Sequence, residues 1–384
     1  MQQIVFILCS AIVLSACNSS SEKSDTSENT SESKKVVPAS GYYSLNGLMD
    51  QTKVYVNLHI TEQAIRGSYT DEKTGRLVHL FSIQYQPQED SILLLASPYR
   101  AVQEIIAGED TLLLVYDKQS FKGFLKKSGE SAVPVEWNII SDNSALAFEP
   151  ISIKDSVVMP EGPAAYIDME ILAPHPSTPD TLSARLHQWI IEFGLPELNT
   201  VPEKTATAAQ TYVSHYLNDF KTNIQRAIAS TEMDYSLPVY QYQQQRVMNV
   251  LYNRNNLLVL SNYIFDYSGG AHPNHVTRIR CFDIQQGKEL KWEDVFKANP
   301  NDMSALMEEY FRQIRGIKPN EPLKSVLFED KLVPNQNFYI TQGGIGFWYV
   351  PYEIAAYVYG DTEVFIPYAA LKPYLKEDFL KRLE

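Results

Sequence analysis

Residues 267–275, which read YSGGAHPNH, hold the clearest potential for chemistry in this sequence. Two histidines, His272 and His275, lie three residues apart and follow two adjacent glycines. With Asp266 or Asp283 they could coordinate a metal ion, since zinc accepts imidazole and carboxylate ligands. The protein would then be a metal-dependent hydrolase that acts on a cell-wall polymer or an ester. A loop has no helical face to make these side chains converge, however, and no third ligand is obvious.

A structural role accounts for the same residues. Adjacent glycines accept positive φ angles at no steric cost, as a strand reversal requires. The proline after His272 keeps that histidine extended, where it could hydrogen-bond a facing segment near Tyr352 and Glu353. We therefore predict that Gly269, Gly270, His272, Tyr352 and Glu353 belong to a binding surface, and we expect no catalytic residue, bound metal or cofactor there.

Other signatures of catalysis are missing from the sequence. It has no Gly-x-Ser-x-Gly or His-Glu-x-x-His motif and no phosphate-binding glycine loop. Cys281 lies between Arg280 and Phe282 on an expected strand, where we predict a buried thiol that packs as a small apolar residue. The sequence thus favours a protein that is not an enzyme, with the metal-dependent hydrolase as the alternative.

The N-terminal residues read as a secretion and lipidation signal. Residues 4–16 form an uncharged apolar run that is too short to span a bilayer and ends in Leu-Ser-Ala before Cys17. This pattern predicts a lipoprotein signal peptide over residues 1–17, in which the Cys17 thiol accepts a diacylglyceryl group. The alternative is an ordinary signal peptide with an incidental cysteine. The first three residues, MQQ, lack the usual Lys or Arg.

The next segment, residues 18–39, is rich in Ser, Thr, Glu and Lys and has almost no apolar content through residue 35. Such a composition cannot bury enough surface to offset chain entropy, so we predict a disordered tether. An acylated Cys17, a tether and folded domains together predict a lipid anchor in the bacterial cell envelope. Asn18 after the cysteine favours the outer membrane.

Bulk composition excludes some partners. The 384 residues carry a formal net charge of -13, so no basic face is available for nucleic acid. An acidic surface instead attracts cationic partners. Three cysteines, two of them in the expected signal peptide, leave no basis for a disulfide framework.

Two kinds of folded region are expected. Residues 40–150 contain short alternating strands and no helix signal, which predicts a small antiparallel β-barrel or sandwich. Gly67 and Gly123 are expected at bends of its sheet, and His59 and His79 on strand faces exposed to water. Residues 151–384 mix strands with amphipathic helices near 179–193, 205–229 and 302–315, which predicts an α+β domain with a mainly antiparallel sheet.

Two longer segments carry a family pattern. Residues 267–296 read YSGGAHPNHVTRIRCFDIQQGKELKWEDVF, and residues 337–368 read NFYITQGGIGFWYVPYEIAAYVYGDTEVFIPY. The sequence here resembles the RsiV-like domain-of-unknown-function family over about residues 155–375. The matching positions are Gly269, Gly270, Ala271, His272, Asp283, Gly287, Lys288, Leu290, Asp294, Phe296, Pro351, Tyr352, Glu353, Ile354, Ala355, Tyr357, Gly360, Ile366, Pro367 and Tyr368.

The resemblance implies work in the cell envelope. Domains of this family occur in an anti-sigma factor that senses lysozyme by binding it, and beside the deacetylase domain of a peptidoglycan deacetylase. It therefore implies a lysozyme-like protein or peptidoglycan as the ligand, with residues 151–262 and 263–384 as the two halves of the domain. The sequence shows neither a sigma-binding segment nor a deacetylase domain, so we do not carry those activities over.

Overall fold

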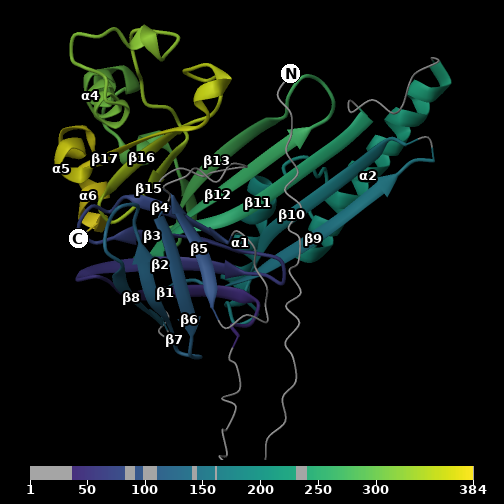
Figure 1. Ribbon diagram of the computed structural model, residues 1–384, viewed down its shortest axis with the longest axis horizontal. Helices are drawn as coiled ribbons and strands as arrows, with labels where there is room; N and C mark the ends of the chain where they lie inside the picture. Colours follow the sequence, from purple (N-terminus) through teal and green to yellow (C-terminus); the bar gives the residue numbers. More distant parts are fainter. Residues whose placement is uncertain are drawn as a thin grey trace, which may run out of the picture. The chain divides into compact units, whose positions relative to one another are not determined.

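The computed structural model describes residues 37–82, 91–97, 110–140, 145–160, 162–230 and 240–383 (Figure 1). Cys17, Asn18 and nearly all of the expected tether lie outside these ranges. Residues 36–384 form one compact unit.

The first part of this unit is a closed antiparallel barrel, which confirms the barrel form of the predicted all-β fold. Strand β1 pairs with both β2 and β8, so the sheet closes. A Cβ on Gly67 or Gly123 would lie within about 2 Å of a neighbouring carbonyl oxygen, so both glycines allow the close approach that a bend requires. The strands are β1 Gly41–Met49, β2 Thr52–Ile60, β3 Ile65–Asp71, β4 Leu77–Ser82, β5 Ile92–Ser97, β6 Asp110–Tyr116, β7 Ser120–Lys126 and β8 Val133–Ile139.

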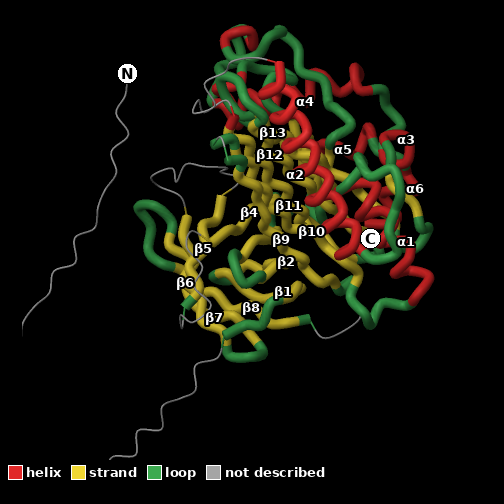
Figure 2. The backbone as a smooth tube through the Cα atoms, turned by 90° about the vertical axis from the view of Figure 1, so that its right-hand side faces the viewer, coloured by secondary structure: helices red, strands yellow, loops and turns green. Residues whose placement is uncertain are grey.

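A six-stranded sheet follows, in the order β14-β13-β12-β11-β10-β9. All neighbours are antiparallel except β10 and β11, which are parallel because α1 and α2 form the crossover between them. Both helices lie on one face of this sheet and share a core with it (Figure 2). The elements are β9 Phe148–Val158, β10 Ala164–Pro174, α1 Asp180–Gly194, α2 Thr205–Ser230, β11 Gln241–Arg254, β12 Leu257–Tyr267, β13 Asn274–Asp283 and β14 Lys288–Leu290.

A three-stranded antiparallel sheet, β15-β16-β17, completes the fold and has two different faces. One face carries Phe347 and Val364 and shares a core with α3 and α4. The opposite face carries Tyr339, Trp348 and Glu363, as the strand register requires. The elements are α3 Trp292–Val295, η2 Pro300–Met303, α4 Ser304–Arg315, η3 Leu323–Ser325, β15 Phe338–Ile340, β16 Gly344–Tyr349, η4 Tyr357–Tyr359, β17 Thr362–Pro367, α5 Tyr368–Leu371, η5 Lys372–Tyr374 and α6 Glu377–Leu383.

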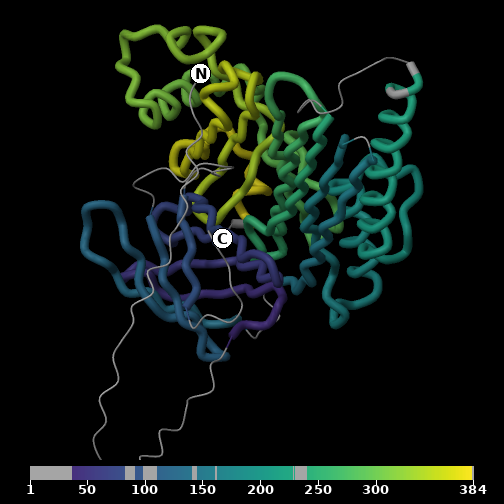
Figure 3. The backbone as a smooth tube through the Cα atoms, turned by 45° about the vertical axis from the view of Figure 1, so that its right-hand side comes forward, coloured from purple at the N-terminus to yellow at the C-terminus, as the bar shows by residue number. Residues whose placement is uncertain are grey.

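The barrel contacts both sheets, and Figure 3 shows its purple and blue strands beside the yellow C-terminal segments. At the small sheet, the Thr341 hydroxyl donates to the Gly75 carbonyl oxygen at 2.7 Å. At the larger sheet, β11 has a bulge between Val250 and Tyr252. The bulge frees backbone groups from the ladder, and the Ser68 hydroxyl donates to the Val250 carbonyl oxygen at 3.1 Å.

The prediction that His59 and His79 face water is wrong. Their side chains point outward from the barrel, but β11 and β16 cover that face, so the residues are 3% and 7% exposed. His59 Nε2 accepts a hydrogen bond from the backbone N–H of Val250 at 3.1 Å. The ring of His79 meets Trp348 edge-on, with 5.6 Å between centroids. Strand alternation identified the outward face, and tertiary packing buried it.

Candidate functional site

The turn between β12 and β13 has the backbone conformation that its glycines predict. Gly269 and Gly270 have φ angles of 91° and 106°, which a side chain would disfavour. The Tyr267 hydroxyl donates to the Gly270 carbonyl oxygen at 3.1 Å and closes the turn. The reversal places the exposed side chain of His272 just before β13 begins at Asn274.

The segment that faces this turn is residues 350–361, which connects β16 to β17. Glu353 fixes its start, because one carboxylate oxygen accepts from the Val350 N–H at 3.0 Å and the other from Asn335 Nδ2 at 2.8 Å. Tyr352 has a φ of 68°, an uncommon conformation for a bulky residue that the surrounding loop must hold. The loop thus presents Tyr352 in a strained backbone conformation.

Three rings from these two segments form a cluster, which we call the aromatic surface: His272, Tyr352 and Tyr357. The centroid of His272 lies 4.6 Å from that of Tyr357, and Tyr352 lies 5.6 Å from Tyr357. The interplanar angles of these two pairs are 32° and 35°. The Tyr357 hydroxyl donates to the Pro273 carbonyl oxygen at 2.9 Å, which fastens the loop to the turn.

The aromatic surface is open to solvent. Tyr352 is 54% exposed, and the loop also exposes Val358 at 85% and Tyr359 at 38%. Tyrosine at such positions combines a large apolar area with a polar tip, and it is enriched where proteins bind partners. The turn and the loop together form a partly apolar surface that is exposed to solvent.

Next to this surface, His275 and Asp361 lie close together, and the His275 ring is 6.0 Å from that of Tyr357. Nε2 of His275 lies 3.6 Å from the Asp361 carboxylate, and both side chains are largely buried. The second carboxylate oxygen accepts from the Thr277 hydroxyl at 3.4 Å. The pair ties β13 to the loop. Across the part of the chain that the structure describes, no three His, Cys, Asp or Glu side chains converge as metal ligands.

The structure brings most of the predicted site residues together. Gly269 and Gly270 form the turn that carries His272, and the Tyr352 hydroxyl lies 3.5 Å from His272 Nε2. Glu353 has no hydrogen bond to this histidine and instead accepts from Val350 and Asn335. Tyr357 and Asp361 were not predicted as site residues. Tyr357 was one of the positions that match the family pattern, and the segment YVYGD carried a second signal, since a glycine next to two tyrosines and an acid suggests an exposed turn.

A second polar cluster lies where the barrel meets the small sheet. Glu363 is 1% exposed and accepts a hydrogen bond from the Tyr339 hydroxyl. Burial raises the pKa of the Glu363 carboxyl to about 7, although the Tyr339 hydrogen bond and the Arg76 guanidinium both lower it. This carboxyl therefore holds a proton in the native protein at pH values where an exposed glutamate has lost it.

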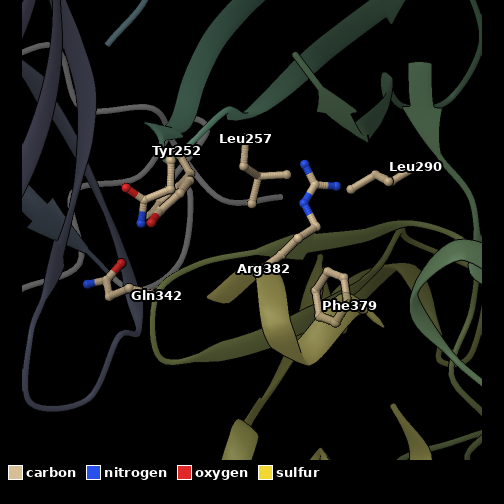
Figure 4. A pocket seen from close by; sticks show the side chains of 7 residues that line it. Tyr252, Leu257, Leu290, Gln342, Phe379 and Arg382 are labelled. Carbon is tan, nitrogen blue, oxygen red and sulfur yellow. The ribbon is translucent and has the colours of Figure 1, made fainter. Parts of the chain in front are cut away.

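Figure 4 shows a small cavity where β11, β12 and α6 approach one another. Its volume is about 30 Å³, which suffices for one or two water molecules and for no larger ligand. Arg382 lines it, but its guanidinium already pairs with the buried Asp283 carboxylate at 2.6 Å. Cys281 is buried as predicted, and burial raises the pKa of its thiol. Neither feature offers a reactive site.

Two stretches of the chain match models of known domain families. Residues 187–275 match the family described as deacetylase PdaC, and residues 293–369 match a family of proteins of unknown function, DUF3298. The first stretch contains most of α1 and the turn with His272, and the second contains the loop with Tyr352 and Tyr357. The resemblance drawn from the sequence is thus confirmed at the level of these domains, and the aromatic surface lies where they meet.

Two solved structures are similar to parts of this chain, and the first of them supports the fold. A DUF3298 family member from Bacteroides fragilis NCTC 9343 is 25% identical, covers 63% of this chain and 99% of its own, and has a TM-score of 0.57. A DUF3298 family protein from Pseudomonas aeruginosa PAO1 is 16% identical, covers 60% of this chain and 96% of its own, and has a TM-score of 0.43. No curated protein matches the chain. Among the helices described, none has the length and apolar character to cross a membrane.

Proposed function

We propose that this protein is a lipid-anchored recognition protein of the bacterial cell envelope, and that its ligand binds at the aromatic surface. The observation that carries the proposal is the cluster of exposed His272 and Tyr352 with half-buried Tyr357, whose ring centroid lies 4.6 and 5.6 Å from theirs. Backbone strain at Tyr352 supports it, since strained residues cluster at ligand-binding sites.

The ligand that fits this surface best is a cationic protein of the lysozyme type. The faces of aromatic rings attract lysine and arginine side chains, and tyrosines dominate the energetics of many interfaces. The chain has a formal net charge of -13, which accelerates association with a basic partner. Recognition of such a protein requires no chemistry at the site.

A peptidoglycan ligand is the second candidate. The match of residues 187–275 to a family described as a deacetylase supports a ligand from the cell wall. Tyr352 and Val358 would supply apolar contact area for such a polymer. Both ligands engage the same surface, so one set of variants tests both.

The test is binding of the chain from Asn18 onward to lysozyme by calorimetry and to insoluble peptidoglycan by co-sedimentation. We expect Tyr352→Ala to weaken binding by about tenfold or more, as for a central aromatic hot spot. Tyr166→Ala is the matched control, because Tyr166 is 48% exposed on β10. If both ligands fail to bind at micromolar concentration, or if the two variants weaken binding equally, the assignment of this surface is wrong.

The anchor is tested separately. In the native host, we expect the mature protein to begin at Cys17 with acyl chains attached, and to fractionate with the outer membrane. Mass spectrometry of the N-terminal peptide detects the modification, and Cys17→Ser should release the protein from the membrane. An unacylated native protein in the cytosol would refute the proposed location and leave the binding test unaffected.

The metal-dependent hydrolase is the rival enzymatic function. The observation behind it is the proximity of His275 Nε2 and the Asp361 carboxylate, 3.6 Å apart, since a general base combines an imidazole with a nearby acid. Elemental analysis of protein purified without an affinity tag distinguishes the two functions. Stoichiometric zinc, lost in His275→Gln, would support the hydrolase and contradict the recognition protein.

A further inference from the structure

The outer surface of the barrel carries a continuous apolar row. Leu93 of β5 lies opposite Leu113 of β6, Leu113 lies opposite Phe124 of β7, and Phe124 lies opposite Pro134 of β8. Leu93, Leu113 and Phe124 are 44%, 50% and 56% exposed. Directly opposed side chains on one face of a sheet touch, so these residues form one patch rather than scattered apolar positions.

A second row of outward-facing side chains adjoins the first. Val115 lies opposite Lys122, Lys122 lies opposite Glu136, and Glu136 lies opposite Leu48. Val115 and Leu48 are 52% and 51% exposed. The two rows border an open groove of about 640 Å³. The interior of the barrel is filled separately by its own core, so these residues contribute nothing to that core.

Both lysines and acidic residues lie around this patch. Asp50, Lys122 and Glu136 line the groove, and Lys122 pairs with Asp117 at 3.6 Å and with Glu136 at 3.3 Å. Residues 113–127 contain four lysines against one aspartate, whereas the chain has a net charge of -13. Strand alternation places Lys122, Phe124 and Lys126 on the same outward face of β7, and all three are exposed. Lys122 and Lys126 thus flank Phe124, and exposed lysines beside aliphatic and aromatic side chains are the combination that anionic membrane surfaces attract.

We infer that this face of the barrel docks on an anionic phospholipid surface, with Leu113 and Phe124 in the interfacial region and Lys122 and Lys126 at the headgroups. The inference rests on the lipid anchor proposed above, which brings a membrane within reach. The two dozen residues from Cys17 to β1 span at most about 80 Å, so the barrel is the folded element that the anchor holds nearest the bilayer.

Vesicle co-sedimentation of the chain from Asn18 onward tests this surface without the acyl chains. We expect binding to vesicles of phosphatidylethanolamine and phosphatidylglycerol, weaker binding to phosphatidylcholine alone, and loss at high salt. Lys122→Gln and Lys126→Gln should each weaken partition about fivefold, the fold-change that corresponds to about 1 kcal/mol. Leu113→Ser with Phe124→Ser should abolish it.

The matched control is Val158→Ser with Tyr166→Ser, which removes two side chains that are 63% and 48% exposed on β9 and β10. The control should bind vesicles like the unmodified chain. Absence of binding to anionic vesicles, or equal effects of the two double variants, would overturn the inference. So would a dimer in sedimentation velocity that Phe124→Ser abolishes, because a second copy would then occupy the patch. Acylation is measured separately, on the native protein. The proposed anchor and the proposed docking surface can therefore be refuted independently of each other.

Discussion

The buried His59 gives the protein a pH dependence that can be worked out from the structure. Its Nε2 accepts from the Val250 N–H at 3.1 Å, and burial lowers the pKa of its imidazole to about 3. The unfolded chain takes up a proton near pH 6.5, whereas the folded protein does not. The free energy of unfolding therefore decreases as the pH falls from about 6.5 to about 3, by about 1.4 kcal/mol per pH unit.

Glu363 acts in the opposite direction. Burial raises the pKa of its carboxyl from 4.5 to about 7, so between these values the folded protein holds a proton that the unfolded chain has lost. Its contribution to stability is fully present below pH 4.5 and is lost as the pH rises toward 7. Between about pH 4.5 and 6.5, the changes in unfolding free energy that His59 and Glu363 cause are about equal and opposite. The unmodified protein therefore shows neither effect.

The variant that separates them is His59→Gln, because an amide oxygen near the position of Nε2 can accept from Val250 without titrating. Relative to the unmodified protein, we expect the variant to gain about 3 kcal/mol of unfolding free energy when the pH falls from 6.5 to 4.5. Glu363→Gln should instead lose about the same amount relative to the unmodified protein over this pH range.

Urea unfolding followed by tryptophan fluorescence at several pH values provides the measurement. The other carboxyl groups titrate alike in each protein, so the difference between variant and unmodified protein isolates the residue that was changed. His215→Gln, at an exposed position of α2, controls for loss of an imidazole. A difference for His59→Gln that stays constant from pH 4.5 to 6.5 would refute the view that this histidine is buried and neutral.

Three further predictions follow from local geometry. Gly270→Ala should cost about 1 to 3 kcal/mol of stability, because residue 270 has a φ of 106°; an unchanged urea midpoint would contradict this. Arg382→Met should cost about 3 kcal/mol, because it leaves the fully buried carboxylate of Asp283 unpaired, whereas Lys324→Met at an exposed pair should change the midpoint little. The Cys281 thiol should react with Ellman's reagent only after unfolding, so reaction in the native protein would show that the strand opens.

Much of the fold could be predicted because the local patterns are strong. Short alternating strands predicted the barrel, and the apolar stripe of residues 205–229 predicted α2 almost to its ends. Residues 253–256, which read NRNN, have the composition of a turn, and Asn255 and Asn256 both adopt positive φ between β11 and β12. Such two-residue turns favour asparagine because it tolerates that conformation. These features depend on neighbours in the sequence, so a single sequence contains them.

The errors and omissions all involve contacts between distant segments. His59 lies on the outward face of its strand, and nothing in residues 52–60 shows that the β11 bulge covers it. Tyr357 completes the aromatic surface only because the loop after β16 folds against the β12–β13 turn, which lies more than 80 residues earlier. Alternation can tell which way a side chain points, but tertiary packing decides what that side chain meets.

The arrangement of the small sheet suggests how the two proposed surfaces could work together. Strand β16 begins at Gly344, next to the contact between Gly343 and Gly75 of the barrel, and ends at Tyr349, next to the loop that carries the aromatic surface. The barrel contacts are buried hydrogen bonds and a close glycine approach rather than a flexible linker. A barrel docked on a membrane would therefore hold the aromatic surface at a fixed orientation to that membrane. Ligand recognition would then occur at a defined height above the bilayer instead of at the end of a free tether.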